Sequence, residues 1–365
     1  MKSMNKRLLT LLIGLIVIGL AITIYFNRFH TIPLEQGDLL KVHFIDVGQG
    51  DATLLQGPDF TILIDTGRHD RNDVLPYLRS QNIREIDLLV GTHPHADHIG
   101  QFPQILENFQ VDEVWMSGDL HTTRSFENAL DAIENTEAHY NEPKAFEKYS
   151  FGSAQIEIIH PKNITGDLNN GSIVLRLHYE NLIFLFTGDA ELNAEQEILE
   201  RGHDVKADIL KIGHHGSNSS TSELFLEKID PEVAIYSVAI DNSYGHPHPN
   251  VIDRLKRRGV DIYGTDLFGT IVLITDGNRY DIDVSRRAEL VEFAVISDDN
   301  SCIDINSAYR DELINIVNIG SARADELIQL RPFTSLEQLG LINGISHHRL
   351  TEIIAEGKAC MNETE

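Results

Sequence analysis

The sequence predicts an α/β fold in which mixed sheets are sandwiched between helices. Short β-rich runs alternate with helical stretches from about residue 39 to residue 277, a pattern typical of a layered α/β domain. Three apolar runs, residues 86–90, 181–186 and 209–212, are each followed closely by histidine or aspartate. Because loops that follow buried strands often carry binding and catalytic residues, we expect the chemistry of this chain at these strand ends.

The composition excludes several classes of protein. Of the 365 residues, 42% are hydrophobic and 24% are charged, which excludes disordered and fibrous proteins. The formal net charge is −26, from 30 Lys+Arg and 56 Asp+Glu, and this argues against a protein that holds nucleic acid by bulk electrostatics. The length predicts two or three domains. Two cysteines exclude a disulfide scaffold and a Cys-rich zinc module.

Residues 1–30 are expected to be a short cytoplasmic tip followed by a transmembrane signal anchor. Residues 8–26 carry no charge and as a helix would span about 28 Å, close to the thickness of a bilayer core. Basic residues before this run outnumber those just after it, so we expect the N-terminus inside the cell and the body outside. The alternatives are a buried core helix and a cleaved signal peptide, for which no small-residue cleavage site follows.

Three further segments are expected after the anchor. Residues 31–284 form the predicted α/β domain, residues 285–300 a linker, and residues 301–365 a small all-α domain without strand signals. Within the last segment, residues 313–320 and 339–345 resemble each other. This internal similarity predicts helix, tight turn and helix twice.

The strongest functional signal is the run Thr92-His93-Pro94-His95-Ala96-Asp97-His98. Imidazole and carboxylate are ligands that zinc prefers and, with more oxygen, manganese. Four potential ligands within six residues can serve two ions if the chain turns tightly after a strand, and residues 86–90 supply that strand. The alternative, a solvated His-rich loop, does not explain Asp189 and His214-His215 at the ends of later apolar runs.

Six motifs follow one another along the chain: HFIDVGQGDATLL (43–55), LVGTHPHADHIG (89–100), FTGDAE (186–191), LKIGHHGSNSSTS (210–222), YGHPHP (244–249) and TDLFGTIVL (265–273). They resemble the metallo-β-lactamase fold and, more closely, the extracellular β-lactamase-like domain of ComEC-type competence proteins. The resemblance spans roughly residues 38–280 and implies an αββα metallo-β-lactamase sandwich. The many channel helices of a full competence protein have no match here, so a DNA-uptake channel is a candidate partner.

The resemblance also implies the metal ligands. They are His93 and His95 for the first ion, Asp97 and His98 for the second, and Asp189 as the bridge between them. Either His214 or His215 would complete the second site, and His214 is favoured because it is nearer to the strand. His160 is the candidate for a further histidine that the fold normally carries before the bridging aspartate. The implied cofactors are two divalent ions, with zinc and manganese both open.

Other residues are expected around this site. The resemblance places His246 and His248 beside it, in a proline-bracketed loop, where they would hold a phosphate or protonate a leaving oxygen. The alternative for this loop is a rigid surface turn. With Asp97, these two histidines are the catalytic candidates. The residues expected to orient the ligands are Asp46, Asp51 and Asp65.

Such a site supports a hydrolase hypothesis. Two divalent ions lower the pKa of a bound water to about 7, which creates a hydroxide able to attack a phosphodiester. The ions also give an acidic protein one positive spot for an anionic substrate. We expect a membrane-anchored, outward-facing bacterial phosphodiesterase, in the first place a nuclease acting on DNA. The alternatives are a hydrolase of another exported phosphoester or ester, and a DNA-capture module with weak or no catalysis.

Residues 303–320 resemble the helix-hairpin-helix modules of ComEA-type DNA receptors, whose turns contact phosphate through backbone N–H groups. The implied DNA-contact residues are Asn318, Gly320, Gly344 and Ser346. Ten acidic residues against five basic ones from residue 302 onward predict weak, salt-sensitive binding, and a packing or protein-docking role is the alternative. Cys302 and Cys360 bracket the module and are expected to be either one disulfide or two buried thiols.

Overall fold

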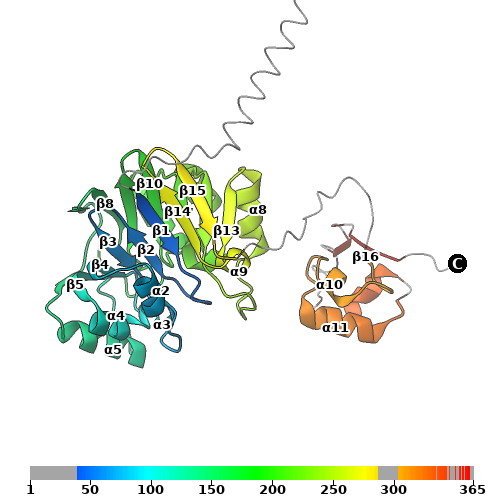
Figure 1. Cartoon of the computed structure of the whole chain (residues 1–365). Helices are drawn as coiled ribbons and strands as arrows, with labels where there is room; N and C mark the ends of the chain where they lie inside the picture. Colours follow the sequence, from blue (N-terminus) through cyan, green and yellow to red (C-terminus); the bar gives the residue numbers. More distant parts are fainter. Residues whose placement is uncertain are drawn as a thin grey trace, which may run out of the picture. The chain divides into compact units, whose positions relative to one another are not determined.

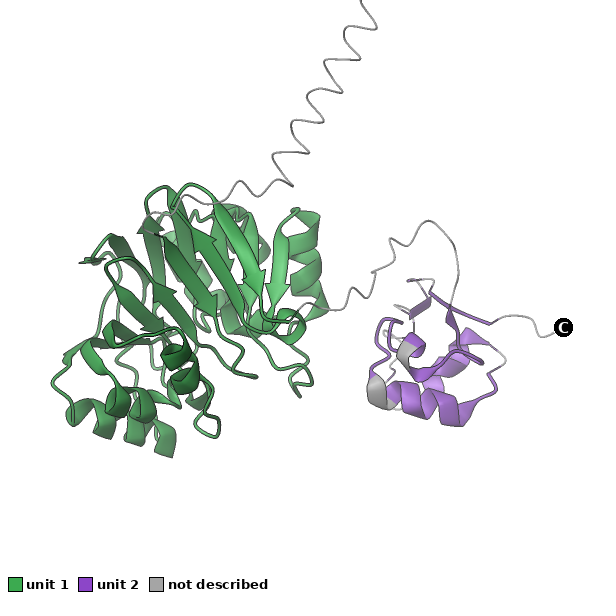
Figure 2. Cartoon of the chain, viewed as in Figure 1, with its two compact units in different colours: residues 1–289 green, residues 290–365 purple. Residues whose placement is uncertain are grey.

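The computed structural model describes residues 39–286 and most of residues 303–361. Its gaps are residues 1–38, 287–302, 334, 343–344, 346–349, 351–352, 355, 357 and 362–365. The predicted anchor and most of the predicted linker lie outside the described residues. Within the described part of the chain, no helix is long and apolar enough to cross a membrane. The chain divides into two compact units, residues 1–289 and 290–365 (Figure 2), which are described separately below.

Unit 1 contains two mixed β-sheets (Figure 1). The first has the order β15 (Tyr280–Val284), β14 (Ile271–Thr275), β1 (Leu40–Phe44), β2 (Thr53–Gln56), β3 (Thr61–Ile64), β4 (Glu85–Gly91), β5 (Gln110–Met116) and β6 (His139–Asn141). The second has the order β13 (Asp261–Gly264), β12 (Val233–Tyr236), β11 (Ile209–Lys211), β10 (Leu182–Phe186), β9 (Val174–Tyr179), β8 (Ala154–His160) and β7 (Lys148–Phe151).

Helices cover the outer face of each sheet. The first sheet carries α2 (Val74–Ser80), α3 (Ala96–Ile99), α4 (Phe102–Asn108) and α5 (Arg124–Glu134). The second carries α6 (Leu192–Glu200), α7 (Glu223–Ile229) and α8 (Pro249–Arg257). A single turn, α9 (Thr265–Phe268), precedes β14, and a short 3₁₀ turn, η1 (Gly213–Gly216), follows β11. This arrangement of layers confirms the predicted αββα sandwich.

Alternation along the strands explains the three layers of core. In β3, Ile62 and Ile64 point into the core between the sheets, whereas Leu63 packs under the helices of the first sheet. In β10, Phe184 and Phe186 lie between the sheets and Leu185 packs under the helices of the second. Successive side chains of a strand face opposite sides, so strands buried on both faces are apolar throughout.

Parallel pairing brings the ends of several strands to one place. Strands β3, β4 and β5 are parallel, and so are β10, β11 and β12. The segments after β3, β4, β10 and β11 therefore leave the sheets at the same edge. The two sheets are joined there, because the Ile173 N–H before β9 donates to the Thr92 carbonyl after β4 at 2.8 Å. Asp65, His93, Asp189 and His215 all follow these strand ends.

Unit 2 contains α10 (Arg310–Leu313), α11 (Ser321–Leu330) and η2 (Leu336–Leu341) around a small core. The prediction of a segment without strands was wrong, because β16 (Ile303–Asp304) pairs in parallel with β17 (Ala359–Cys360). Two-residue strands give too short a pattern to read from sequence. Cys360 is disulfide-bonded, and Cys302, the only other cysteine of the chain, lies outside the described residues.

The expected hairpin turns are described only in part. Asn318 lies between α10 and α11 with a φ of 63°, the left-handed conformation that asparagine tolerates and that the first turn requires. Ile319 is buried in the core of unit 2 and Gly320 is the N-cap of α11. Gly344 and Ser346, expected in the second turn, lie outside the described residues.

We expect Phe184→Ala to lower the free energy of unfolding of unit 1 by about 3–5 kcal/mol, because the fully buried ring fills the core between the sheets. Urea titrations followed by tryptophan fluorescence would measure this. Trp115 is the only tryptophan of the chain and is buried in the same core. Phe146→Ala is the matched control and should cost less than about 1 kcal/mol, because Phe146 is 53% exposed. Equal losses in the two variants would contradict the assignment of this core.

Candidate metal centre

The loops that carry the candidate ligands are held together by backbone hydrogen bonds. The Asp51 N–H donates to the Asp97 carbonyl at 3.1 Å and the Thr66 N–H to the His98 carbonyl at 2.6 Å. Gly50 has a φ of +141°, and a Cβ on it would lie 2.4 Å from the Asp97 carbonyl oxygen. Glycine is therefore required here for both conformation and space. These contacts fix the start of α3, and with it Asp97 and His98, against the loops after β1 and β3.

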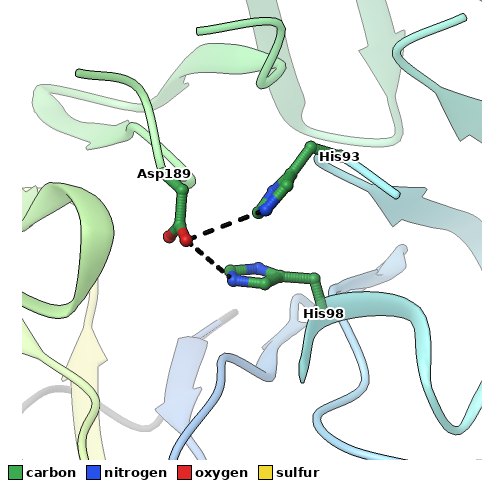
Figure 3. A group of neighbouring side chains, drawn as sticks. All are labelled: His93, His98 and Asp189. Carbon is green, nitrogen blue, oxygen red and sulfur yellow. Dashed lines mark ion pairs between the residues drawn. The ribbon is translucent and has the colours of Figure 1, made fainter. Parts of the chain in front are cut away.

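The carboxylate of Asp189 lies at the centre of the site. Its Oδ2 is 3.3 Å from His98 Nε2 and 3.7 Å from His93 Nε2 (Figure 3). His215 Nε2 also lies 3.7 Å from this oxygen and 3.5 Å from Asp97 Oδ2. One carboxylate oxygen thus faces three imidazoles from two separate segments, the motif after β4 and η1. This is the placement expected of a carboxylate that bridges two cations.

Several polar atoms in this cluster are buried without a hydrogen-bond partner among the described residues. They are His98 Nε2, His215 Nε2, Asp189 Oδ1 and Asp51 Oδ1. The other nitrogen of each ring is occupied: His98 Nδ1 lies 2.8 Å from Asp65 Oδ2 and His215 Nδ1 2.9 Å from the Ser237 carbonyl. Buried polar atoms are normally paired, and metal-ligating histidines typically bind a carboxylate or carbonyl through the second nitrogen. The donor set therefore fits divalent metal ions.

Four groups of side chains have ligand atoms that all lie within 4.8 Å of one another. They are His93, His98 and Asp189; Asp97, His98 and His215; Asp51, Asp189 and His215; and Asp51, Asp65 and His98. His98, Asp189 and His215 each occur in more than one group. Overlapping groups around shared residues are what two neighbouring ions need.

Two further histidines of the predicted ligand set lie at the edge of these groups. His95 Nδ1 is 2.8 Å from His93 Nε2, so the two rings are close enough to serve one ion. His214 Nδ1 lies 2.9 Å from Glu191 Oε1, and its Nε2 is 3.8 Å from Asp189 Oδ2. His214 belongs to none of the groups within 4.8 Å.

The geometry favours His215 over His214, against the preference drawn from sequence. Both residues have left-handed backbones, with φ of 46° and 55°. In the resulting tight turn, it is the second histidine that points to Asp189 with an unpaired, buried nitrogen. The first turns to Glu191 and keeps 23% of its side chain exposed.

Two predicted residues lie elsewhere. Both ring nitrogens of His160 have other partners, the Asn170 carbonyl at 2.7 Å and the Arg201 guanidinium at 3.3 Å. This histidine therefore supports the loop before β9 and does not reach the cluster. Asp46 accepts the Gly48 N–H and pairs with Arg286 at 3.0 Å near the surface, so it orients no ligand. Asp51 and Asp65, in contrast, lie inside the cluster as expected.

His246 and His248 lie beside the cluster. The His246 ring is 5.6 Å from that of His214 and 6.3 Å from that of His215, and its Nδ1 is buried without a partner in the described part of the chain. Burial, with the neighbouring histidines, lowers the pKa of His246 to about 4. His248 Nδ1 accepts the Asn218 N–H at 3.3 Å.

Burial and charge act in opposite directions on the ligands. Burial lowers the pKa of His93 well below its ordinary value. Burial would also lower the pKa of His98, but the attraction of Asp189 and Asp65 outweighs it and raises this pKa well above the ordinary value. Metal binding requires the neutral ring. An incoming cation would therefore displace a proton from His98 while it replaces the positive charge beside Asp189.

Lys211 is a residue of the site that the sequence analysis did not single out. Its side chain is 3% exposed, and Nζ lies 2.8 Å from Asp51 Oδ2. Burial alone would raise the pKa of Asp51, but Lys211, followed by His215 and His98, lowers it. A lysine within the apolar run 209–212 was the available signal, because a charged residue in a buried strand needs a partner.

We expect Lys211→Met to lower the free energy of unfolding of the metal-free protein by about 3–5 kcal/mol, since it leaves a buried carboxylate uncompensated. Trp115 fluorescence during urea unfolding would measure this. The double variant Asp51→Asn/Lys211→Met is the control and should recover most of the loss, because neither charge is then left unpaired. A single variant as stable as the wild type would contradict this role of the ion pair.

The comparisons with known proteins agree with the geometry. Residues 45–239 match the metallo-beta-lactamase superfamily and residues 298–355 the helix-hairpin-helix motif. ComE operon protein 3 of Bacillus subtilis (strain 168) is 30% identical over 290 residues, which cover 74% of this chain and 37% of that protein. Competence protein ComA of Neisseria gonorrhoeae is 28% identical over 240 residues, which cover 62% of this chain and 31% of that protein.

A third relative matches over a shorter stretch of the chain. A deoxyribonuclease of Thioalkalivibrio sp. (strain K90mix) is 43% identical over 60 residues, which cover 16% of this chain and 17% of that protein. This chain spans about a third of the length of the two competence proteins. The expected resemblance to ComEC-type proteins is thus confirmed for the β-lactamase-like part, and the expected helix-hairpin-helix motif is confirmed by the match over residues 298–355. The chain belongs to the metallo-beta-lactamase superfamily of metal-dependent hydrolases and is related to the ComEC-type competence proteins.

Proposed function

We propose that this protein is a metal-dependent phosphodiesterase that cleaves DNA. The observation that carries the proposal is the convergence of unpaired, buried nitrogens of His98 and His215 on the carboxylate of Asp189. DNA is favoured over another phosphoester or ester for two reasons. The chain carries a helix-hairpin-helix motif, and its relatives are named as competence proteins and as a deoxyribonuclease.

Two divalent metal ions, zinc or manganese, would supply Lewis-acid activation of water and positive charge for the developing phosphorane oxygens. The proposed ligands are His93 and His95 for one ion, Asp97, His98 and His215 for the other, and Asp189 for both. Asp65 and the Ser237 carbonyl orient the rings of His98 and His215 through their second nitrogens. Preorganised ligands of this kind need no rearrangement when charge develops in the transition state.

His246 is proposed to contact the substrate. Its Nδ1 is buried without a partner in the described residues, and its ring lies 5.6 Å and 6.3 Å from the rings of the two histidines of η1. From there it can hydrogen-bond a phosphate oxygen or the leaving oxygen. His248 is proposed to position the loop after η1, since it accepts the Asn218 N–H and its own N–H donates to the Gly216 carbonyl.

We further propose that the protein is a single-pass protein of the bacterial cell membrane, with its body outside. The support is the uncharged run of residues 8–26 behind three basic residues. An outside location agrees with the disulfide at Cys360, because disulfides persist in oxidising compartments. A DNA-uptake channel is the proposed partner at this membrane.

We expect the metal-loaded protein to degrade single-stranded DNA, and His215→Ala to lose this activity by at least about 100-fold. The reason is that His215 is the proposed ligand of the second ion, with a buried Nε2 that lies 3.5 Å from Asp97 Oδ2 and 3.7 Å from Asp189 Oδ2. Gel electrophoresis of a labelled oligonucleotide would follow the cleavage, and metal analysis would follow the bound ions, which should fall from two to one per protein.

His214→Ala and His139→Ala serve as controls. His214→Ala should keep both ions, because the ring of His214 is turned to Glu191, with Nδ1 2.9 Å from Oε1, and is partly exposed. His139→Ala should behave like the wild type, since this side chain is 77% exposed on the edge strand β6. No cleavage of any nucleic acid with zinc or manganese would overturn the nuclease proposal. A larger loss of metal in His214→Ala than in His215→Ala would reverse the ligand assignment.

Unit 2 is proposed to contact the DNA backbone. Removal of residues 301–365 should weaken binding of a DNA strand several-fold and make the remaining binding less dependent on salt. The same truncation should leave the metal-dependent hydrolysis of bis(p-nitrophenyl) phosphate unchanged, because unit 1 contains all the proposed ligands. Fluorescence anisotropy between 50 and 200 mM salt, a range roughly suited to phosphate contacts, would measure the first effect. Unchanged DNA affinity would favour a packing or protein-docking role for unit 2.

A further inference from the structure

A row of aromatic rings leads from the metal-ligand cluster to the surface. The rings of His215 and His246 are 6.3 Å apart with 26° between their planes, and those of His246 and Tyr244 are 5.7 Å apart with 24°. Tyr244 is 62% exposed. The row therefore begins at a buried ligand and ends in a ring that is open to solvent.

The loop that carries Tyr244 is held in a defined conformation. Asn242 Oδ1 accepts the N–H groups of Tyr244 and His246 at 3.2 and 3.0 Å, and Asn242 Nδ2 donates to the His246 carbonyl at 2.6 Å. An exposed aromatic ring on a fixed loop beside a catalytic centre is a surface on which another flat ring can stack.

Arg68 lies on a neighbouring loop, after β3. The Gly100 N–H donates to the carbonyl of Gly67 at 2.9 Å, which holds this loop against the end of α3. Asp70 binds the guanidinium through Nε at 2.8 Å and Nη2 at 2.7 Å, which leaves Nη1 without a partner in the described part of the chain. Its hydrogen bonds to Asp70, and to a lesser degree the charges of Asp70 and Asp97 and the nearby phenol of Tyr244, raise the pKa of Arg68.

Arg68 carries a positive charge in acidic surroundings. The chain as a whole is strongly acidic, and the loops around the cluster contribute several carboxylates. A guanidinium that is fixed by one carboxylate and has free N–H groups is well suited to bind a phosphate. Its side chain is 39% exposed, so it is accessible to a strand that approaches Tyr244.

We propose that Tyr244 and Arg68 form a nucleotide subsite next to the metal centre, in which a base of single-stranded DNA stacks on Tyr244 and a neighbouring phosphate binds Arg68. The proposal rests on the phosphodiesterase function proposed above and adds the reason for a preference for single strands. A base in a duplex is stacked between its neighbours and has no free face to offer the tyrosine. The subsite recognises bases in general and reads no sequence.

The test compares two strands that carry the same phosphates. One is an oligothymidylate and the other an abasic strand of equal length, and fluorescence anisotropy measures their binding to the metal-free full chain, which cannot cleave them. Tyr244→Ala should weaken binding of the thymine strand about tenfold, as expected for loss of one stacked base, and leave the abasic strand unaffected. Tyr244→Trp should restore the difference. Arg68→Ala should weaken binding of both strands by similar factors.

Two variants control for indirect effects. Ile240→Ala changes a side chain of the same loop that is 64% exposed, and Arg124→Ala removes an arginine side chain that is 85% exposed on α5. Neither should alter binding of either strand. Photocrosslinking of a 5-iodouracil strand should, in addition, modify a peptide that contains Tyr244.

The possible outcomes distinguish a failure of the nucleotide subsite from a failure of the proposed phosphodiesterase function. If Tyr244→Ala binds both strands as the wild type does, or if the wild type binds neither strand, the subsite is wrong even when the metal-loaded protein cleaves DNA. If the thymine strand binds and crosslinks as expected while the metal-loaded protein cleaves no phosphodiester, the subsite stands and the proposed function fails. A preference for duplex over single strands would overturn the stacking argument.

Discussion

The structure of unit 1 depends on the burial of several carboxylates in one small region. Asp51, Asp65 and Asp189 are each at most 3% exposed, and their oxygens lie within reach of the same histidines. Isolated buried carboxylates would cost many kcal/mol. The surroundings compensate for this charge: Lys211 pairs with Asp51, and Thr92 donates its N–H and hydroxyl to Asp65. At Asp189 burial alone would raise the pKa, but the charges of His98 and His215 outweigh it and lower this pKa well below the ordinary value, and the proposed cations would take over this compensation.

This requirement explains why the site lies at the joined edge of two sheets. A single strand end can offer one or two side chains, whereas the parallel strands of both sheets deliver loops to the same edge. Backbone hydrogen bonds between those loops, such as that from Ile173 to Thr92, supply the rigidity. His93, His98, Asp189 and His215 are each at most 2% exposed, and burial strengthens the charge interactions among them.

Local patterns were enough to predict much of this arrangement. The β-rich run 61–64 and the helical stretch 74–80 coincide with β3 and α2, because alternation and helical spacing are properties of neighbouring residues. The motif around His93 and His98 was readable for the same reason. In contrast, the choice between His214 and His215 depends on two consecutive left-handed residues, and no spacing rule predicts such a turn.

Contacts between side chains that are distant in sequence could not be predicted. Lys211 and Asp51 are 160 positions apart, and only the folded sheets bring them together. His160 was a candidate ligand because the resemblance implies a further histidine before the bridging aspartate. Its nitrogens are taken by Asn170 and Arg201, which lie on segments whose approach the sequence does not encode locally. A histidine at a strand end therefore indicates a ligand only when one of its ring nitrogens is left without another partner, as it is in His98 and His215 but not in His160.

The overall charge of −26 affects how the protein would bind DNA. A net negative charge of this size repels a DNA strand at long range, and salt weakens that repulsion. Under the proposed function, attraction is expected at the proposed cation site at Asp189, at the guanidinium of Arg68 and at unit 2. A strand held at a few such points and repelled elsewhere would be bound briefly and released after cleavage. Such a charge distribution suits repeated cleavage of a passing strand better than its retention.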